Sequence, residues 1–428
     1  MTAYAEFIER KNRRDPETGF DPDFVSDQLY PFQRDLTEWA LRRGRGAIFA
    51  DCGLGKTPMQ LEWAQRVYEH SNGDVLIVAP LAVSSQTVRE GEKFGIPVTH
   101  CREASDIQPG VNITNYERLE RFMDRQWAGI VLDESSILKS FDGKTREALI
   151  QWAQPYPFRL CCTATPSPND YMELGGHSAF LGVLNHKQML SMFFVNDGID
   201  AGSWRLKGHA RGEYWRWVAT WARALRAPSD LGYDNEAFEL PPIEVETISV
   251  DADSVTEDRL FSVPVATMAE RRQARRESIP QRVEIAAAMV NESDEPWVVW
   301  CDLNAESEAL VRSIPDAVEV RGSDHPDVKE ERLVAFSQGQ SRVIVTKPSI
   351  AGWGLNWQHC ANVLFVGLSD SYEQYYQAVR RCWRFGQTHS VRVVIVASNR
   401  EQAVLENVRR KERQAMEMFE EIVEAMNG

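Results

Sequence analysis

Residues 50–57 read Ala-Asp-Cys-Gly-Leu-Gly-Lys-Thr and follow a short apolar run at residues 47–49. A strand, a glycine turn and a Lys-Thr pair that opens a helix form a cradle for a phosphate group. The turn's backbone N–H groups can point at one anion, the Lys56 ammonium can reach the β- and γ-phosphates, and the Thr57 hydroxyl can bind Mg²⁺. Ala50 stands where the usual pattern has glycine, and a glycine-rich turn before an ordinary helix is the alternative. The intact Gly-x-Gly-Lys-Thr favours a phosphate site made of Gly53, Leu54, Gly55, Lys56 and Thr57.

Apolar runs alternate with helical patterns along the rest of the chain, which is typical of βαβ units around a parallel sheet. Helices are predicted at 59–70 and 84–94, and a long charged helix at 401–426. A stretch with Pro, Asp and Gly at 227–242 predicts a connection between two α/β lobes. The predicted strands are 47–49, 75–79, 111–114, 129–132 and 159–163 in the first lobe, and 297–301, 318–321, 343–346, 363–366 and 391–397 in the second.

The composition is that of an ordinary globular protein without an apolar stretch of membrane-spanning length. Of the 428 residues, 43% are hydrophobic and 26% are charged. The seven Cys include no Cys-x-x-Cys pair and predict free thiols in a reducing cytosol, and the eight scattered His suggest no metal cluster. The net charge of −15 argues against a globally basic nucleic-acid-binding surface but leaves room for a local basic groove.

A second nucleotide signal is the run Ile130-Val-Leu-Asp133-Glu134. An apolar strand that ends in two carboxylates puts both at the carboxyl edge of a parallel sheet, where ligands bind in open α/β folds. Asp133 would hold Mg²⁺ through its water shell, and Glu134 would polarise the attacking water. Asp-Glu after a strand is often a solvated loop, but its place after the phosphate loop, with strand patterns between, favours a catalytic pair.

Two further segments suit a nucleotide site. Cys161-Cys-Thr-Ala-Thr-Pro166 ends a predicted strand, and it is either a plain strand exit or a link to a second ligand. The stretch 377–387 carries Gln377, Arg381 and Arg384 at i, i+4 and i+7, which on one helix face the same way. Two Arg on one face suit a triphosphate because the planar guanidinium binds phosphoryl oxygens bidentately, and a basic surface helix is the alternative.

These segments, in this order, resemble the motifs of helicase superfamily two, most closely those of its Swi/Snf-type DNA translocases. Leu29-Tyr-Pro-Phe-Gln33 is similar to the glutamine motif that reads adenine, and Asp133-Glu-Ser-Ser136 with Lys139 is similar to the Asp-Glu-x-His box. Ser136 departs from the family, which usually has His there. The match covers roughly residues 28–397 and includes the segments 76–80, 113–116, 163–169, 321–336, 351–356 and 377–387.

The resemblance implies two tandem RecA-like parallel-sheet lobes with ATP and Mg²⁺ in the cleft between them. It implies a nucleic-acid-stimulated ATPase that moves along DNA rather than RNA, a minimal viral or prokaryotic form that works in the cytoplasm without a membrane partner. The implied domains are an N-terminal extension at 1–28, a first lobe at 29–238, a second lobe at 239–398, and a C-terminal helix at 399–428 packed on the second lobe. The implied catalytic residues are Lys56, Asp133, Glu134, Gln377, Arg381 and Arg384, with Gln33, residues 53–57 and Gly354 binding nucleotide and Thr57 and Asp133 binding the metal.

The residues that would contact nucleic acid are less clearly marked. The stretch 204–226 interleaves basic and aromatic residues, which suits contacts with phosphates and bases. However, Tyr214, Trp217, Trp221 and Leu225 fit helical spacing, so a core-facing aromatic stripe is at least as good an interpretation. A second basic cluster, formed by Arg271, Arg272, Arg275 and Arg276, is typical of a solvated helix face.

Two other functions remain compatible with the sequence. One is the motor subunit of a larger restriction or defence complex. The other is an ATP-bound clamp or scaffold that hydrolyses little, which the departure at Ser136 leaves open and the intact Lys56, Asp133 and Glu134 argue against.

Overall fold

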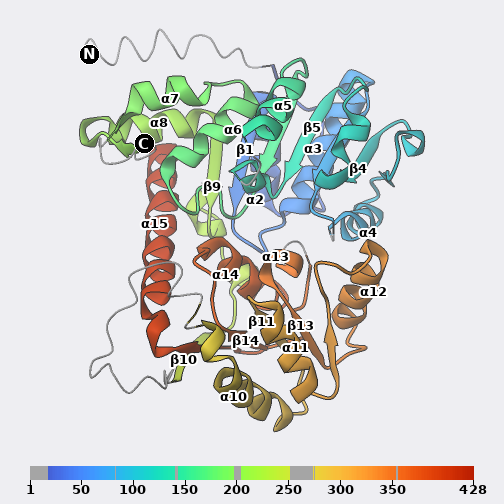
Figure 1. The fold of residues 1–428 in the computed structure, drawn as a ribbon. Helices are drawn as coiled ribbons and strands as arrows, with labels where there is room; N and C mark the ends of the chain where they lie inside the picture. Colours follow the sequence, from blue (N-terminus) through green and yellow to red (C-terminus); the bar gives the residue numbers. More distant parts are fainter. Residues whose placement is uncertain are drawn as a thin grey trace. The chain divides into compact units, whose positions relative to one another are not determined.

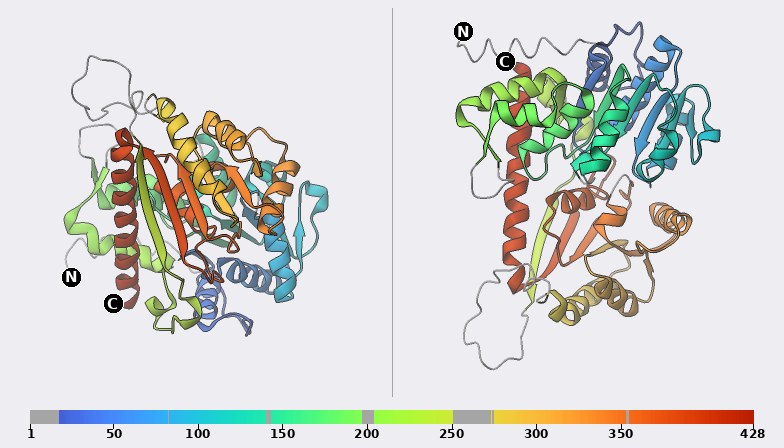
Figure 2. Two further views of the ribbon diagram at one scale, coloured as in Figure 1. Left: turned by 90° about the horizontal axis from the view of Figure 1, so that it is seen from below. Right: turned by 45° about the horizontal axis from the view of Figure 1, so that its top comes forward.

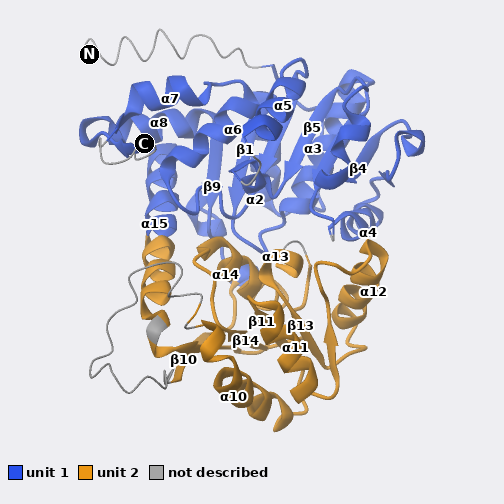
Figure 3. Ribbon diagram, viewed as in Figure 1, with its two compact units in different colours: residues 1–238, 414–428 blue, residues 239–413 orange. Residues whose placement is uncertain are grey.

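The computed structural model describes residues 18–81, 83–139, 143–196, 204–250, 273, 275–352 and 355–428. The chain divides into two compact units (Figure 3). Unit 1 comprises Met1–Phe238 and Gln414–Gly428, and unit 2 comprises Glu239–Arg413. Each unit is built on one parallel sheet, which confirms the prediction of two tandem RecA-like α/β lobes.

The sheet of unit 1 has seven parallel strands in the order β3-β4-β2-β5-β6-β1-β9. Figure 1 labels β1, β4, β5 and β9 among them. Every residue of β2, β4, β5 and β6 is buried. Burial on both faces explains why these strands read as continuous apolar runs in the sequence. The sequence pattern missed the two edge strands, β3 and β9. The strands are β1 Arg45–Ala50, β2 Val75–Ala79, β3 Val98–His100, β4 Val111–Asn115, β5 Gly129–Asp133, β6 Phe158–Cys162 and β9 Ala222–Leu225.

Helices cover both faces of this sheet. Alternate residues of a strand point to opposite faces, and Val75 and Ile77 accordingly belong to one hydrophobic cluster while Leu76 and Val78 belong to another. The first cluster includes side chains of α2 and α3, and the second includes side chains of α5 to α8. The helices are α2 Pro31–Arg43, α3 Lys56–Ser71, α4 Ser84–Phe94, α5 Gly143–Ala153, α6 Leu174–Leu181, α7 His186–Phe193 and α8 Arg211–Trp221, with a small antiparallel pair of strands, β7 Phe194–Asn196 and β8 Trp204–Leu206.

The aromatic residues of α8 are core residues. Tyr214, Trp215, Trp217 and Trp221 are all buried, and Trp217 stacks on Phe193 of α7 with 5.3 Å between ring centroids. The interpretation of 204–226 as an aromatic surface for nucleic acid is therefore wrong for α8. The alternative of a core-facing helical stripe is confirmed for Tyr214, Trp217 and Trp221, whereas Leu225 is buried in the strand β9 and not on the helix. Helical spacing gathers these rings on the side of the helix that packs against the sheet.

The C-terminal segment forms one uninterrupted helix, α15 Gln402–Asn427, seen from two sides in Figure 2. We expected residues 399–428 to pack on the second lobe, but Gln414–Gly428 belong to unit 1. There Met418, Phe419 and Ile422 join the core, and Arg211 Nε of α8 lies 2.6 Å from Glu421 Oε1. The last part of α15 carries its own apolar stripe, which is the physical reason that it packs onto a core. No helix in the described part of the chain is long and apolar enough to span a membrane.

Unit 2 has a sheet of six parallel strands in the order β10-β15-β14-β11-β13-β12. The edge strand β10 was not predicted from the sequence. Its residues 244–247 are all exposed and include one apolar residue among three polar ones, so they form no apolar run. The strands are β10 Ile243–Val250, β11 Trp297–Cys301, β12 Ala317–Glu319, β13 Val343–Thr346, β14 Asn362–Val366 and β15 Val391–Ser398, and the helices are α10 Ile279–Asn291, α11 Asn304–Ser313, α12 Pro326–Ser337, α13 Pro348–Ala351 and α14 Tyr372–Val379.

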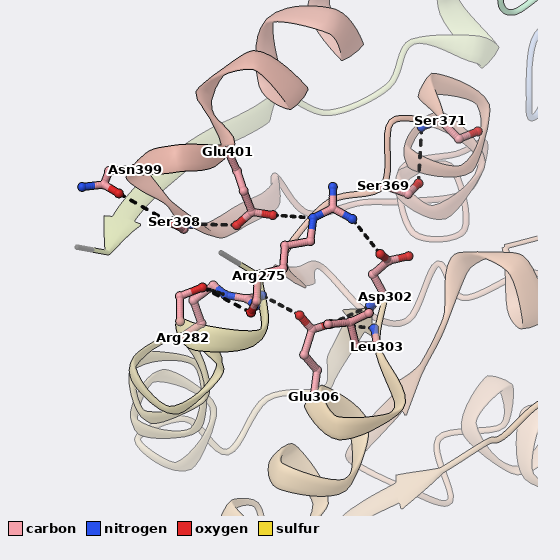
Figure 4. A network of polar contacts seen from close by, with 11 residues as sticks. Arg275, Arg282, Asp302, Leu303, Glu306, Ser369, Ser371, Ser398, Asn399 and Glu401 are labelled. Atoms are coloured by element: carbon pink, nitrogen blue, oxygen red, sulfur yellow. Dashed lines mark hydrogen bonds and ion pairs between the residues drawn. The ribbon is translucent and has the colours of Figure 1, made fainter. Parts of the chain in front are cut away.

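A buried polar network crosses unit 2 (Figure 4). Arg275 lies 2.7 Å from Glu401 and 2.8 Å from Asp302, and the fully buried pair Arg282 and Glu306 is joined at 2.7 Å. The expectation that Arg275 lies on a solvated helix face is therefore wrong, since its side chain is held between two carboxylates. Arg271 and Arg272 of the same cluster lie outside the described residues. The network fastens the segment before α10 to the start of α11 and to the residue that precedes α15.

Candidate active site

The phosphate loop of unit 1 joins β1 to α3. Its backbone turns through two left-handed residues, Gly53 at φ 89° and Gly55 at φ 78°. Only glycine adopts these angles without a steric penalty, so the spacing of the two glycines is set by the shape of the turn. The helix begins at Lys56, as predicted, so the N–H groups of its first turn have no partner within the helix and are available to an anion.

Lys56 lies folded back over this loop. Its Nζ donates to the carbonyl oxygen of Ala50 at 2.9 Å and to that of Asp51 at 3.3 Å. These bonds hold the ammonium beside the turn where a phosphate would be wrapped by backbone N–H groups. The positive charge and the helix N-terminus thus favour the same anion.

Gln33, in the first turn of α2, is tied to the phosphate loop. Its side-chain Nε2 donates to the carbonyl oxygen of Leu54 at 3.0 Å, and its Oε1 accepts from the backbone N–H of Tyr30 at 3.0 Å. A Cβ atom added at Gly55 would come within 2.2 Å of this Nε2. The second glycine of the loop therefore also leaves room for the glutamine side chain.

Asp133, at the end of β5, is held by a residue that the sequence reasoning missed. Gln60 Nε2 of α3 donates to Asp133 Oδ1 at 2.7 Å, and both side chains are buried. The Tyr116 hydroxyl donates to the Asp133 carbonyl oxygen at 2.7 Å. Burial, with Asp133 nearby, raises the pKa of Tyr116 well above its ordinary value, so the hydroxyl stays a donor. Gln60 stands one helical turn after Lys56, and that spacing was the available sequence signal.

Glu134 has a backbone conformation that glutamate rarely adopts, with φ at 50°. Its carboxylate Oε2 accepts from the Thr163 hydroxyl at 3.2 Å, and its carbonyl oxygen accepts from Ile137 N–H at 3.1 Å. The Thr163 hydroxyl in turn accepts from Thr165 N–H at 3.1 Å. The segment after β6 is therefore more than a strand exit, because it contacts the carboxylate directly. Non-glycine strain of this kind concentrates at functional sites.

The residues proposed from unit 2 gather around one carbonyl group. We expected a helix through residues 377–387, but α14 ends at Val379 and the two Arg lie in the turn that follows. Their clustering does not depend on the helix. Arg381 and Arg384 both donate through Nη1 to the Leu355 carbonyl oxygen, at 2.9 and 3.2 Å, and Arg381 Nη2 also donates to Gln377 Oε1 at 2.9 Å. Gly354 lies outside the described residues.

Two family models match the chain in the order of its two units. The SNF2-related domain matches residues 32–196, and the helicase conserved C-terminal domain matches residues 281–386. The first match contains the phosphate loop, the Asp133–Glu134 pair and Thr163, and the second contains Gln377, Arg381 and Arg384. Domains of this kind use ATP with a divalent metal.

Individual relatives agree with the family models. The chain is 23% identical to putative protein p41 of Acyrthosiphon pisum secondary endosymbiont phage 1, over 82% of this chain and 87% of that protein. It is 24% identical to the mouse DNA annealing helicase and endonuclease ZRANB3 over 89% of this chain, but spans only 39% of the mouse protein. A shorter match, 29% identical over 37% of the chain, is to helicase SWR1 of Debaryomyces hansenii, of which it spans 11%. With its tandem parallel sheets, its phosphate loop and its paired carboxylates, the chain belongs to the Swi/Snf branch of helicase superfamily two, whose members are ATP-dependent DNA helicases and translocases.

Proposed function

We propose that this ATPase binds MgATP at the phosphate loop of unit 1 and uses its hydrolysis to move along duplex DNA. The observation that carries the proposal is the Glu134 turn, in which a strained backbone and the Thr163 hydroxyl hold one carboxylate at the carboxyl edge of the sheet. A purely structural acidic residue would gain nothing from such a conformation. A catalytic carboxylate gains a fixed orientation before the substrate binds.

The donor set fits a magnesium ion. Thr57 supplies a hydroxyl oxygen and Asp133 a carboxylate, and Mg²⁺ prefers such oxygen ligands together with water and substrate phosphates. Gln60 engages one Asp133 oxygen at 2.7 Å and so fixes the plane of that carboxylate. When bound, the ion would neutralise charge on the β- and γ-phosphates.

The remaining steps belong to the chain's own residues. Lys56 draws the β- and γ-phosphates into the loop, and the N–H groups of residues 53–57 bind their oxygens. Gln33 recognises the adenine base, and its hydrogen bond to the Leu54 carbonyl oxygen links this contact to the phosphate loop. Glu134 accepts a hydrogen bond from the attacking water and takes its proton, while Thr163 keeps the carboxylate in place.

For unit 2, we assign the phosphate contact during turnover to Arg384 and a supporting role to Arg381. Arg381 is buried and its guanidinium is bonded to Gln377 and Leu355, whereas Arg384 is partly exposed. The Leu355 carbonyl oxygen keeps its bond from Arg381 when Arg384 moves, so the partly exposed Arg384 guanidinium can reach a substrate without leaving that acceptor unsatisfied. Family membership supports the assignment, because the matched C-terminal domain includes both residues.

The decisive experiment is ATP turnover of the full chain without polymer and with duplex DNA, single-stranded DNA or RNA. We expect stimulation by duplex DNA, and Lys56→Ala should abolish turnover because the charge on the phosphates is lost. Lys93→Ala is the matched control, since Lys93 is an exposed residue of the same unit whose one ion pair within the described part of the chain is with Glu90 at 3.1 Å.

Each other result selects a different function. Turnover that RNA stimulates and duplex DNA does not would refute DNA as the track. ATP binding without turnover under any condition would favour the clamp. Stimulation that appears only with a second protein would favour the motor subunit of a larger complex. Displacement of a third strand from a DNA triplex would then separate translocation from simple DNA-stimulated hydrolysis.

The free, mostly buried cysteine thiols support a reducing compartment as the place where this protein acts.

A further inference from the structure

His177 is a buried polar residue that the site described above does not use. It lies in α6 with 2% of its surface exposed. Its Nε2 lies 3.0 Å from Ser135 Oγ, and its ring packs edge-to-face on Phe49 with 5.3 Å between centroids. Ser135 follows Glu134 directly, and Phe49 lies in β1, just before the phosphate loop. One imidazole therefore contacts both chain segments that carry the proposed ATP machinery of unit 1.

The bond between His177 and Ser135 is a bond between neutral groups. Burial, with a smaller effect of Lys139, lowers the pKa of His177 to about 3. The ring is therefore uncharged at any pH at which the enzyme would work, and protonation does not switch the contact. A neutral hydrogen bond inside a protein is directional, and its value here lies in the orientation that it gives to the Ser135 backbone.

The turn that carries Glu134 needs such support. Among the described non-glycine residues, only Glu134 and Asn72 have positive φ, and Asn72 ends a helix, where asparagine is readily accepted. Glutamate has no such preference, so neighbouring contacts must hold its conformation. Thr163 holds the carboxylate and Ile137 holds the carbonyl group. The side chain of the next residue, Ser135, is held by His177.

The position at which the family usually has histidine gives no comparable support. Ser136 is 1% exposed, and its hydroxyl has no hydrogen-bond partner among the described residues. The turn is therefore not braced by a polar contact from Ser136. It is braced by a histidine that reaches it from α6, which follows the Thr163–Pro166 segment along the chain.

We propose that His177 is a positioning residue for Glu134, whose turn it holds from α6 through the Ser135 hydroxyl. The proposal rests on the proposed function, in which Glu134 orients the attacking water. In this proposal, His177 makes no direct contact with the attacking water or the nucleotide. It acts through Ser135, and it also ties the Glu134 turn to α6, so that a displacement of α6 would change the orientation of the carboxylate.

The test compares kcat and the KM for ATP in matched variants of the full chain. His177→Phe keeps the ring against Phe49 and removes the Nε2 contact. We expect kcat to fall about tenfold, the order that the loss of one well-placed hydrogen bond produces, with KM within about twofold. His177→Gln places an amide nitrogen near the position of Nε2 and should restore most of the rate. Ser135→Ala should reproduce the loss, and the double variant His177→Phe with Ser135→Ala should be no slower than either single variant.

Ser178→Ala provides the control for destabilisation of α6. Ser178 is the neighbouring buried residue, and its hydroxyl bonds the backbone of Leu184 at 3.0 Å, away from Glu134. Equal losses in Ser178→Ala and His177→Phe, full activity of His177→Phe, or additive losses in the double variant would each overturn the proposal. If His177→Phe does not fold, Ser135→Ala and His177→Gln decide the question by the same criteria. An active Lys56→Ala enzyme would refute the ATP site itself, whereas an inactive one with a fully active His177→Phe refutes only the role of His177.

Discussion

Replacing Gly55 by alanine should reveal how closely the glutamine of α2 is built into the phosphate loop. At φ 78° a Cβ costs about 1–2 kcal/mol, the penalty for the left-handed region. The new methyl group would also lie 2.2 Å from Gln33 Nε2. Gln33 is 4% exposed, so its displacement breaks the 3.0 Å bond to Leu54 without replacement by bulk water, at a cost of about 1–3 kcal/mol. The sum is about 2–5 kcal/mol.

Calorimetric unfolding of Gly55→Ala, Gln33→Ala and the double variant measures the two contributions separately. The transition that ATP shifts reports unit 1, and about 2–5 kcal/mol corresponds to a fall in Tm of roughly 4–20 °C for a unit of this size. In the Gln33→Ala background the clash is gone, so Gly55→Ala should cost only about 1–2 kcal/mol. An equal cost of Gly55→Ala in both backgrounds would refute the close packing of Gln33 on the loop.

Four further outcomes are expected. Glu134→Gln should keep ATP affinity and lose turnover, because the amide can still accept the Thr163 hydrogen bond but cannot take a proton. Loss of ATP binding instead would make Glu134 a structural residue. Arg384→Ala should reduce DNA-stimulated turnover on the order of a thousandfold with ATP affinity within a few-fold, and undiminished stimulation by DNA would exclude the residue from catalysis. DNA affinity should fall steeply between low and physiological salt, since a chain of net charge −15 must rely on local Lys and Arg, and salt-independent binding would contradict this. Arg282→Met should destabilise unit 2 by about 3–5 kcal/mol, because Glu306 stays buried without the arginine that pairs with it. The control Arg392→Met removes an exposed pair with Glu246 and should cost at most about 1 kcal/mol. Equal melting temperatures of the two variants would argue against the buried pair.

The parts of the fold that the sequence predicted well are those that local pattern controls. Strands buried on both faces, such as β2 and β5, must be apolar throughout, and they were predicted within a residue of their observed bounds. Helix α4 was predicted with its observed bounds. The edge strand β10 was missed because solvent on its outer side permits polar residues. The helical reading of 377–387 was wrong beyond Val379, although Arg381 and Arg384 still meet, at the carbonyl group of Leu355.

Burial and partners were the least predictable features. Arg275 reads as part of a basic surface cluster, yet Glu401 and Asp302 hold it inside unit 2. The tryptophans of α8 fitted a stacking surface and a core stripe equally well, and only the packed structure decides between them. The residues next to a charged or aromatic side chain in the sequence do not indicate whether that side chain will be buried by another part of the chain.

The sequence by itself determined the phosphate loop, the carboxylate pair after β5 and the parallel α/β class, because each depends on residues adjacent in the chain. Only the tertiary structure decided what holds those groups in place. Gln60 meets Asp133 across 73 residues, and His177 meets Ser135 across 42. The last residues of α15 join the core of unit 1, where Met426 meets Ala224 of β9 across 202 residues. The physical reason is that burial and hydrogen bonding are satisfied between residues that folding brings together, and their pairing is not written in the spacing along the chain.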